Sequence, residues 1–328
     1  MSELGWNTIE SDAGVFTELI EKLGVKGLEF EELLSIDADT LSSVTPLYGV
    51  IFLFKYRRSE FEAMRRKTQA EGGAAKPLDG EYATAAEDVF FAHQVIQNAC
   101  ATQAVLSLLL NLPERTSAHE QVANLLGSTL SEFRDFVAAF DPELKGEAVS
   151  NSEQIRAAHN SFSRPPAVLD DDKDHRPDRD EEDDGLYHFI AYTRVHGTLY
   201  ELDGLHPHPI SHGECTDTQF PETLAEVLAR RISRAPAGDL RFNLLALTAD
   251  PRPALRAVSD ETGLAREEAK RAAWRRENVL RRANYTGLVT ALVRGITAKR
   301  IAAGDDWNKT VLEPATKKSR ELYNSRKQ

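Results

Sequence analysis

The chain has 328 residues, of which 41% are hydrophobic, and a net charge of −12, so it contains enough apolar residues to bury a sizeable core. Its two cysteines, Cys100 and Cys215, exclude a disulfide framework, and no Cys/His cluster has structural zinc spacing, which favours a reducing compartment, free thiols and no cofactor or metal. Without a signal peptide or an apolar run of about 18 residues, we expect a soluble protein of the cytoplasm, the nucleus or both.

The N-terminal part of the chain predicts a helix, a buried strand and a loop. Apolar residues at helical spacing predict an amphipathic helix over residues 15–24, with Ser11 or Asp12 as its cap. The run LYGVIFLFKY, residues 47–56, is apolar on both faces and predicts a buried central strand. Residues 57–84 are polar and rich in Gly and Ala, which predicts a surface loop or insertion.

The next segment predicts a strand that leads into a buried helix. DVFFAHQVI, residues 88–96, has the composition of a strand. Residues 99–110 are apolar nearly all round, which is typical of a helix in the middle of a domain, and Asn98 is placed to cap it. Two more helices are expected over 119–127 and 129–140.

An acidic segment separates these helices from a predicted hairpin. Residues 170–185, DDDKDHRPDRDEEDDG, cannot be ordered by apolar burial, so we expect them to be mobile. Residues 188–205 then form two strand-like runs about a turn near His196-Gly197. RFNLLALTAD, residues 241–250, predicts a further buried strand, and the helical, Arg-rich text that follows predicts a boundary near residue 250.

Charge is divided unevenly at that boundary. Residues 251–328 carry 18 Lys and Arg against 9 Asp and Glu, whereas residues 1–250 carry 22 against 43. An acidic body with a basic tail suggests two partner surfaces of different kinds. The alternative, which charge alone favours, is a soluble body with a solvated helix face on the tail.

Cys100 lies where the buried helix is expected to begin. A helix N-terminus favours a thiolate, which is the nucleophilic form of cysteine. The local sequence alone favours the alternative, because a cysteine among Ala and Leu is usually a small residue of the core. A nucleophile also needs a base, a group that orients the base, and donors for an oxyanion.

The hairpin supplies a candidate base and acid. With a two-residue loop at Val195-His196, His188 faces Asp203 directly, and with a loop at His196-Gly197 the two are diagonal neighbours. Both registers keep the side chains on one face, whereas a three-residue loop would separate them. A strand-end histidine beside an unrelated acid is the alternative.

Other histidines lie in loops, in the acidic segment or in polar helical text. We assign them no catalytic role: His119, His159, His175, His206, His208 and His212. Gln94, six residues before Cys100, is placed to donate to an oxyanion beside the Cys100 amide, provided that the cysteine is catalytic. Cys215 lies in a polar loop, where we expect an exposed or half-buried thiol without a role.

These features resemble the ubiquitin C-terminal hydrolases, a family of papain-like cysteine peptidases, over most of residues 5–250. The resemblance is carried by GWNTIESDAGVFTELI, LYGVIFLFKY, the Gln94 to Cys100 spacing, LYHFIAY and LYELDGL. Ala13 stands where the family usually has proline, and Ala101 where its short members have glycine. With NACATQA, LSEFRDF, SNSEQIRAAHNSF and RRANY, the chain is most similar to the long, proteasome-associated type, although its end, TKKSRELYNSRKQ, is only loosely similar.

The resemblance implies an α+β, papain-like fold, in which a central, mostly antiparallel sheet is flanked by helices in an α-β-α arrangement. It implies a catalytic domain over 1–250 and a basic helical extension over 251–328 for partner docking or autoinhibition. Residues 165–185 take the place of the family's active-site crossover loop, and 57–84 that of a loop or insertion.

The resemblance also implies a thiol-dependent deubiquitinase. Cys100 corresponds to the nucleophile, His188 to the general base and acid, Asp203 to the residue that orients the histidine, and Gln94 to the oxyanion donor. The implied partners are ubiquitin, its conjugates and the proteasome regulatory particle, reached through a ubiquitin-receptor subunit.

Two other functions stay open at this point. The first is a ubiquitin-binding scaffold whose site is formed but idle, because long members of the family are restrained by their own extensions. The second is nucleic-acid binding by the tail, which only its charge supports, since no base-reading motif accompanies the Arg and Lys residues.

Overall fold

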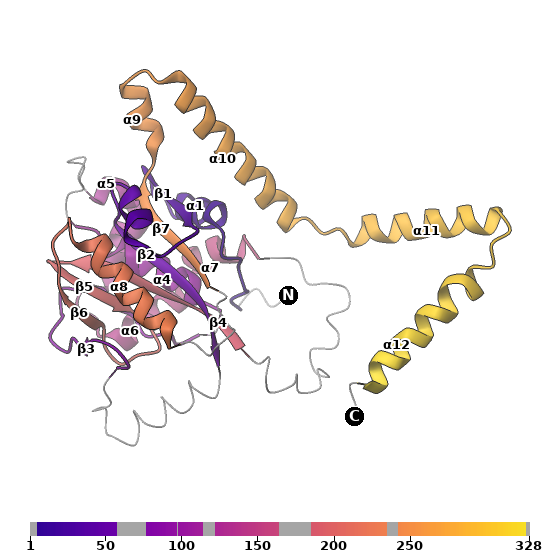
Figure 1. The fold of residues 1–328 in the computed structure, drawn as a ribbon, viewed down its shortest axis with the longest axis horizontal. Coiled ribbons are helices and arrows are strands. Elements are labelled where there is room, and N and C mark those ends of the chain that lie inside the picture. Colours follow the sequence, from indigo (N-terminus) through magenta and orange to yellow (C-terminus); the bar gives the residue numbers. More distant parts are fainter. Residues whose placement is uncertain are drawn as a thin grey trace. The chain divides into compact units, whose positions relative to one another are not determined.

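The computed structural model describes residues 5–57, 77–96, 98–113, 122–163, 185–234 and 242–325. These residues belong to two compact units, one that ends at Arg281 and one that begins at Arg282. The larger unit contains the sheet (Figure 1), and the predicted site residues belong to it.

The sheet has seven strands in the order β1-β7-β2-β4-β5-β6-β3, and every neighbouring pair is antiparallel. β2 pairs with β4 on one side and β7 on the other, which confirms the predicted buried strands near 47–56 and 241–250. The strand bounds are Leu28–Leu33 (β1), Gly49–Arg57 (β2), Glu81–Tyr82 (β3), Gly185–Val195 (β4), Thr198–Leu202 (β5), Ile210–Glu214 (β6) and Phe242–Ala249 (β7).

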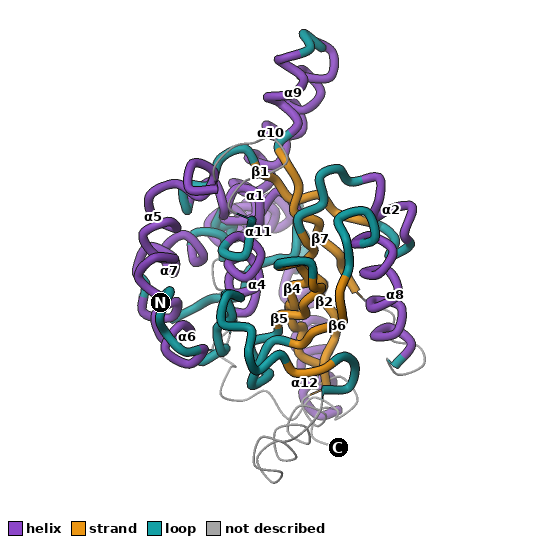
Figure 2. The backbone as a smooth tube through the Cα atoms, turned by 90° about the vertical axis from the view of Figure 1, so that its left-hand side faces the viewer, coloured by secondary structure: helices purple, strands orange, loops and turns teal. Residues whose placement is uncertain are grey.

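Helices cover both faces of the sheet, which confirms the predicted α-β-α arrangement. Figure 2 shows α1, α4, α5, α6 and α7 on one side of the strands and α2 and α8 on the other. Each side has its own apolar core, because β2, β4 and β7 bury alternate residues in opposite directions. The helix bounds are Ala13–Lys22 (α1), Ala38–Ser43 (α2), Cys100–Leu109 (α4), Val122–Val137 (α5), Pro142–Asn151 (α6), Glu153–Asn160 (α7), Phe220–Ser233 (α8), Pro251–Ala257 (α9) and Glu261–Arg282 (α10).

Local cap chemistry explains where the first helix begins. The side chain of Asp12 accepts a hydrogen bond from the Val15 amide at 3.0 Å, so the predicted cap is confirmed and the helix begins at Ala13. α5 joins the two helices expected over 119–127 and 129–140. It bends at Gly127, whose φ of 72° is the left-handed conformation that glycine tolerates.

The predicted strand over 88–96 is wrong, because the described part of this segment has no ladder partner in the sheet. Instead, the side chain of Asn111 accepts from the Phe90 amide at 2.7 Å and donates to the Phe90 carbonyl at 2.8 Å. The His93 amide donates to the Pro142 carbonyl. A buried loop therefore satisfies its backbone through distant residues, which apolar composition cannot distinguish from a strand. Most of the predicted 57–84 and 165–185 loops lies outside the described residues, apart from β3 and its flanks.

A cluster of charges attaches α10 to the body of the larger unit. Arg271 is buried, and its Nη2 lies 3.0 Å from Oε2 of the equally buried Glu29 on β1. Its Nη1 donates to Glu21 at 3.0 Å, and Lys270 donates to the other oxygen of Glu29 at 3.0 Å. Burial raises the pKa of Glu29 although these cations lower it, so the carboxylate depends on them to remain charged.

Close packing accompanies these charges. Gly14 of α1 lies against the Trp274 ring, where an added Cβ would come within 2.6 Å of the ring atoms. Asn278 donates to the Gly14 carbonyl at 3.1 Å, and Arg281 donates to Asp12 at 2.8 Å. The predicted division at residue 250 into catalytic domain and extension stays a prediction, but α9 and α10 belong to the same compact unit as the sheet.

The described part of the smaller unit is helical, as predicted for the tail. It contains α11, Thr286–Ala302, a short π-helical stretch at Asn308–Leu312, and α12, Glu313–Ser325. Among the described residues, no helix combines the length and the apolar character required to cross a membrane. α11 exposes a row of apolar side chains at helical spacing: Leu288, Leu292 and Ile296.

We expect Arg271→Met to lower the free energy of unfolding by about 3 kcal/mol, because it leaves the Glu29 carboxylate buried beside too little positive charge. Denaturant unfolding measures this loss. Arg275→Met, an exposed change on the same helix, is the matched control. The double variant Arg271→Met with Glu29→Gln should recover most of the stability. If Arg271→Met lowered the free energy of unfolding no more than Arg275→Met does, the assignment would be contradicted.

Candidate active site

Cys100 is the first residue of α4 and is partly buried. The sequence suggested Asn98 as the helix cap, and the structure corrects this. Asn98 adopts a positive φ of 68°, and its side chain donates to the Trp6 carbonyl at 3.2 Å. Ala99 occupies the cap position and makes no side-chain hydrogen bond to the helix. The partial positive charge of the helix N-terminus is therefore next to the thiol, without a side chain that caps it.

The hairpin holds His188 and Asp203 on one face. Val195 pairs with Thr198, so the loop is His196-Gly197, and both residues have positive φ, as the tight turns of hairpins require. This is the second of the two registers that the sequence allowed. Asp203 follows the last residue of β5, and its Oδ1 lies 2.7 Å from Nε2 of His188.

The His188–Asp203 pair is buried, and each partner favours the charged form of the other. Burial alone would raise the pKa of Asp203, but the charge and hydrogen bond of His188 outweigh it and hold that pKa well below its ordinary value. Burial alone would lower the pKa of His188, but Asp203, and secondly Cys100, outweigh it and raise that pKa well above its ordinary value. The imidazole is therefore held as an imidazolium at neutral pH.

The structure brings Cys100, His188 and Asp203 together from α4, β4 and the end of β5. The Cys100 side chain lies close enough to His188 to contribute to the raised pKa of the imidazole. Because Nε2 of His188 faces Asp203, Nδ1 is the ring nitrogen left for the thiol. The ring of Phe54, on the neighbouring β2, packs edge-on against the imidazole with centroids 6.2 Å apart.

Gln94 lies in the loop that precedes α4, rather than at the end of a strand. Its amide donates to the Gly204 carbonyl at 2.8 Å, which ties this loop to the residue after Asp203. Its carboxamide donates to the Ile96 carbonyl at 3.3 Å. Gly204 is needed for this approach, because a Cβ there would lie 2.8 Å from the Ala92 carbonyl oxygen and 2.9 Å from the Gln94 nitrogen.

The sequence context of His159 suggested a polar helix surface. In the structure the residue, which belongs to α7, is fully buried against α4. Its Nδ1 lies 2.7 Å from the Thr102 hydroxyl, and its Nε2 lies 2.6 Å from the Asn7 carbonyl oxygen. A neutral ring satisfies both contacts, with Nε2 as the donor. Burial lowers the pKa of His159 to about 4, against the opposing effect of the bond to Asn7. Since Thr102 is in the first turn of α4, this histidine helps to fix the position of Cys100.

A second polar cluster lies beside Asp203. Glu201 is buried and contacts Arg231 of α8, Tyr192 at 3.1 Å and His212 at 3.1 Å. The cluster contradicts the placement of His212 in a loop, because that residue belongs to β6. Burial would raise the pKa of Glu201, but Arg231 and His212 lower it to about 2.

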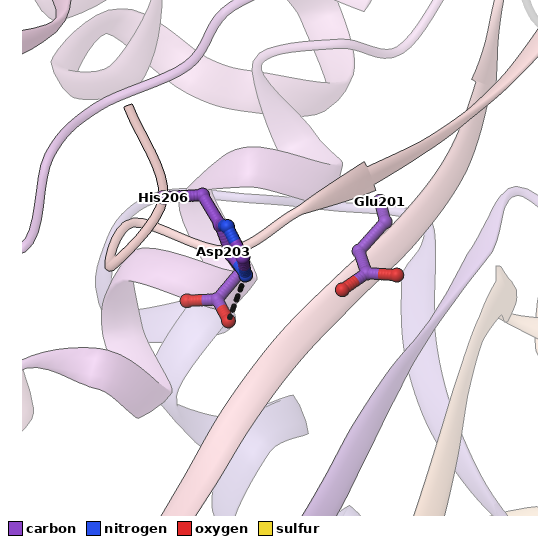
Figure 3. A group of neighbouring side chains, drawn as sticks. All are labelled: Glu201, Asp203 and His206. Atoms are coloured by element: carbon purple, nitrogen blue, oxygen red, sulfur yellow. Dashed lines mark ion pairs between the residues drawn. The ribbon is translucent and has the colours of Figure 1, made fainter. Parts of the chain in front are cut away.

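His206 lies in a loop, as predicted, but it is buried beside Asp203, with its Nε2 3.8 Å from Oδ2 of that residue. The one sequence signal for it was its position three residues after Asp203. Figure 3 shows the His206 ring beside the Asp203 carboxylate, joined to it by the dashed line, with Glu201 to the right of both.

The ligand atoms of Glu201, Asp203 and His206 lie within 4.8 Å of one another, which is a spacing that a metal ion could use. However, Glu201 is already neutralised by Arg231, and Asp203 Oδ1 accepts from His188 and from the Leu205 amide at 2.9 Å. We therefore assign no metal to this group.

Cys215 is buried in the core on the α8 side of the sheet, which corrects the expectation of an exposed or half-buried thiol. Burial raises its pKa, although Arg194 opposes the shift. A buried thiol of raised pKa is a poor nucleophile, so Cys215 offers no alternative to Cys100.

Comparisons with known proteins agree on one family. The family model described as "Ubiquitin carboxyl-terminal hydrolase, family 1" matches residues 6–233, and a model described as "Ubiquitin carboxyl-terminal hydrolases" matches residues 260–300. Ubiquitin carboxyl-terminal hydrolase 2 of Schizosaccharomyces pombe is 42% identical over 314 residues, which cover 94% of this chain and 96% of the relative. Ubiquitin carboxyl-terminal hydrolase ubh-4 of Caenorhabditis elegans is 35% identical over 90% of this chain and 88% of its own.

A solved structure extends the similarity to the fold. Trichinella spiralis UCH37, crystallised with ubiquitin vinyl methyl ester, is 30% identical to this chain. The match covers 83% of this chain and 97% of that one, with a TM-score of 0.59. At this identity and coverage, the papain-like fold predicted from the sequence is confirmed.

We expect the stability of the protein to fall as pH is lowered from 6.5 to about 4, in part because of His159. Its pKa is lower in the folded than in the unfolded chain, so the unfolded chain binds more protons in this window, and the stability present above pH 6.5 is lost on acidification. His159→Gln, which keeps a donor for Asn7, should remove about 3 kcal/mol of that loss. Denaturant unfolding between pH 7 and 4 measures the difference, with the exposed change His196→Asn as control. Equal pH slopes in wild type and His159→Gln would contradict this role.

Proposed function

The chain belongs to ubiquitin carboxyl-terminal hydrolase family 1, and on that premise we propose that its chemistry is carried out by Cys100, His188, Asp203 and Gln94. The class of enzyme, a thiol-dependent deubiquitinase, follows from the family. The observation that carries the assignment of residues is the contact of one thiol, one imidazole and one carboxylate from three separate elements.

In the proposed acylation step, the Cys100 sulfur attacks the carbonyl carbon of the C-terminal glycine of ubiquitin. The imidazolium of His188 lies beside the sulfur, and the thiolate is the form of cysteine that attacks. As the tetrahedral intermediate collapses, His188 gives its proton to the leaving amine, and a thioester remains on Cys100. Asp203 keeps the ring oriented and stabilises its positive charge throughout.

In the proposed deacylation step, His188 takes a proton from water, which then attacks the thioester. Ubiquitin leaves with a free carboxylate, and the thiolate–imidazolium pair is restored. Both tetrahedral intermediates carry an oxyanion, for which we propose the Cys100 amide and the Gln94 carboxamide as donors. The bond between the Gln94 amide and Gly204 holds that loop near the site, and the carboxamide must turn from Ile96 to reach the oxyanion.

We further propose that the acidic segment at 170–185 favours ubiquitin through charge, since the C-terminal tail of ubiquitin is basic. Residues 170–184 lie outside the described part of the chain, so sequence alone supports the proposal. If neutralising Asp170 to Asp172 and Asp180 to Asp184 left the association rate and its salt dependence unchanged, the proposal would fail.

We propose that the C-terminal helices attach the enzyme to the proteasome regulatory particle through a ubiquitin-receptor subunit, which would place it in the cytoplasm and the nucleus. The match of residues 260–300 to a model of the family supports this, as does the apolar row Leu288, Leu292 and Ile296 on α11. Large exposed apolar side chains at helical spacing are typical of a helix that docks on a partner.

A ubiquitin probe with an electrophilic C-terminus tests the proposed catalytic residues. We expect rapid labelling of the wild type and none of Cys100→Ala, whereas Cys215→Ala should label at the wild-type rate. On a fluorogenic ubiquitin amide, His188→Gln and Asp203→Asn should lower kcat by about 10³-fold or more, and Gln94→Ala by about 10²-fold. Labelling that persists in Cys100→Ala would refute the assignment. A folded wild type that binds ubiquitin but never labels would support the scaffold instead.

Truncation tests the role of the tail. Because residues 251–281 belong to the same compact unit as the sheet, and Arg271 pairs with Glu29 of β1, the informative cut is after Arg281 rather than near residue 250. If the tail only docks, the truncated chain should label with the probe as fast as the full chain, but should no longer sediment with the proteasome regulatory particle. Faster labelling after truncation would show instead that the tail inhibits the site.

A further inference from the structure

His206 and His188 contact the same carboxylate from two directions. Oδ1 of Asp203 accepts from His188 at 2.7 Å and from the Leu205 amide at 2.9 Å, whereas Oδ2 faces Nε2 of His206 at 3.8 Å. The loop itself places His206 there, because its amide donates to the Asp203 carbonyl at 2.9 Å and closes a tight turn. The His206 ring is buried, so water screens this contact little.

Tyr82 holds the His206 ring from its other side. The Tyr82 hydroxyl lies 2.9 Å from Nδ1 of His206, and the ring centroids are 5.9 Å apart. Tyr82 belongs to β3, which pairs with β6, so the contact is part of the sheet edge. When the hydroxyl donates to Nδ1, the neutral ring carries its proton on Nε2, which is the atom that faces Asp203.

We propose that His206 is a positioning residue for the hydrolysis, one that directs its Nε2–H at Oδ2 of Asp203 and so keeps Oδ1 turned toward His188, with Tyr82 selecting the required tautomer. The inference rests on the proposed role of the His188–Asp203 pair. At 3.8 Å the contact is electrostatic rather than a full hydrogen bond, so the effect is on orientation. The positive end of the N–H dipole also favours the charged form of the carboxylate, on which the imidazolium depends.

The alternative is that His206 only fills space and anchors the edge strand through Tyr82. The two roles use different ring nitrogens, which makes them separable by substitution. In His206→Gln the side-chain amide reaches the position of Nε2 and keeps a donor for Asp203. In His206→Asn the shorter side chain reaches the position of Nδ1 and keeps a partner for Tyr82. His206→Leu keeps neither.

We expect His206→Leu and His206→Asn to lower kcat on a fluorogenic ubiquitin amide by about tenfold with KM nearly unchanged, because the carboxylate is free to rotate away from His188. His206→Gln should return kcat to within about threefold of wild type. Melting temperatures, measured on the same samples, report the anchoring role separately. If kcat instead follows the melting temperature, so that His206→Asn is active and His206→Gln is not, the positioning role is overturned.

Tyr82→Phe tests the choice of tautomer. Removal of the hydroxyl should lower kcat by a few-fold in the wild-type chain and have no further effect in His206→Gln, where no ring tautomer exists. An equal loss in both backgrounds would show that Tyr82 acts without His206, and would overturn this part of the proposal.

Asp203→Asn separates this inference from the proposed function beneath it. If His206 acts through Asp203, His206→Leu should cause no further loss of kcat in the Asp203→Asn background. If Asp203→Asn alone retains the wild-type kcat, the proposed catalytic role of Asp203 fails. If Asp203→Asn is inactive and His206→Leu is fully active, only the positioning role of His206 fails.

Discussion

The arrangement of this site depends on one buried charge pair, His188 with Asp203. Removing a carboxylate and an imidazolium from water is costly, and the cost is recovered only when geometry is good and the remaining polar atoms are satisfied. Here the two atoms lie 2.7 Å apart, and the Leu205 amide supplies a second donor to the carboxylate. A slip of one residue in the hairpin would move one partner to the opposite face, so the two left-handed residues of the turn are as necessary as the pair itself.

The sulfur must be brought to this pair from another layer of the fold. α4 is buried nearly all round, which fixes the axis of the helix but not its depth or rotation. Polar contacts near its first turn supply the rest: Thr102 bonds to His159, and Asn98 bonds to the Trp6 carbonyl. The close approach at Gly204 then joins the loop before Cys100 to the residue after Asp203. Nucleophile and base are thus held together by contacts that are distant in sequence and adjacent in space.

The contrast between local sequence patterns and contacts that are distant in sequence explains what the sequence could predict. The strands β2 and β7 and the buried helix α4 are encoded in short apolar patterns, and each was predicted correctly. The hairpin sequence narrowed the register to two alternatives, and the structure adopts the one with the loop at His196-Gly197. The segment 88–96 was predicted wrongly as a strand, because its polar backbone groups pair with Asn111 and Pro142. His159 and His206 were missed for the same reason, since nothing near them in sequence indicates that Asn7 and Tyr82 will meet their ring nitrogens.

The role of the C-terminal positive charges likewise depends on partners that are distant in sequence. In the sequence, residue 250 separates an acidic body from a basic tail. In the structure, some of the basic residues after 250 form ion pairs with acidic residues of the body, within one compact unit. Arg271 lies against Glu29 and Glu21, and Arg281 lies against Asp12. After Arg281, 10 Lys and Arg remain against 4 Asp and Glu. Residues 282–328 thus carry a smaller excess of positive charge than the whole region after 250, and they include the apolar row on α11, so the docking surface proposed for the tail is best sought within them.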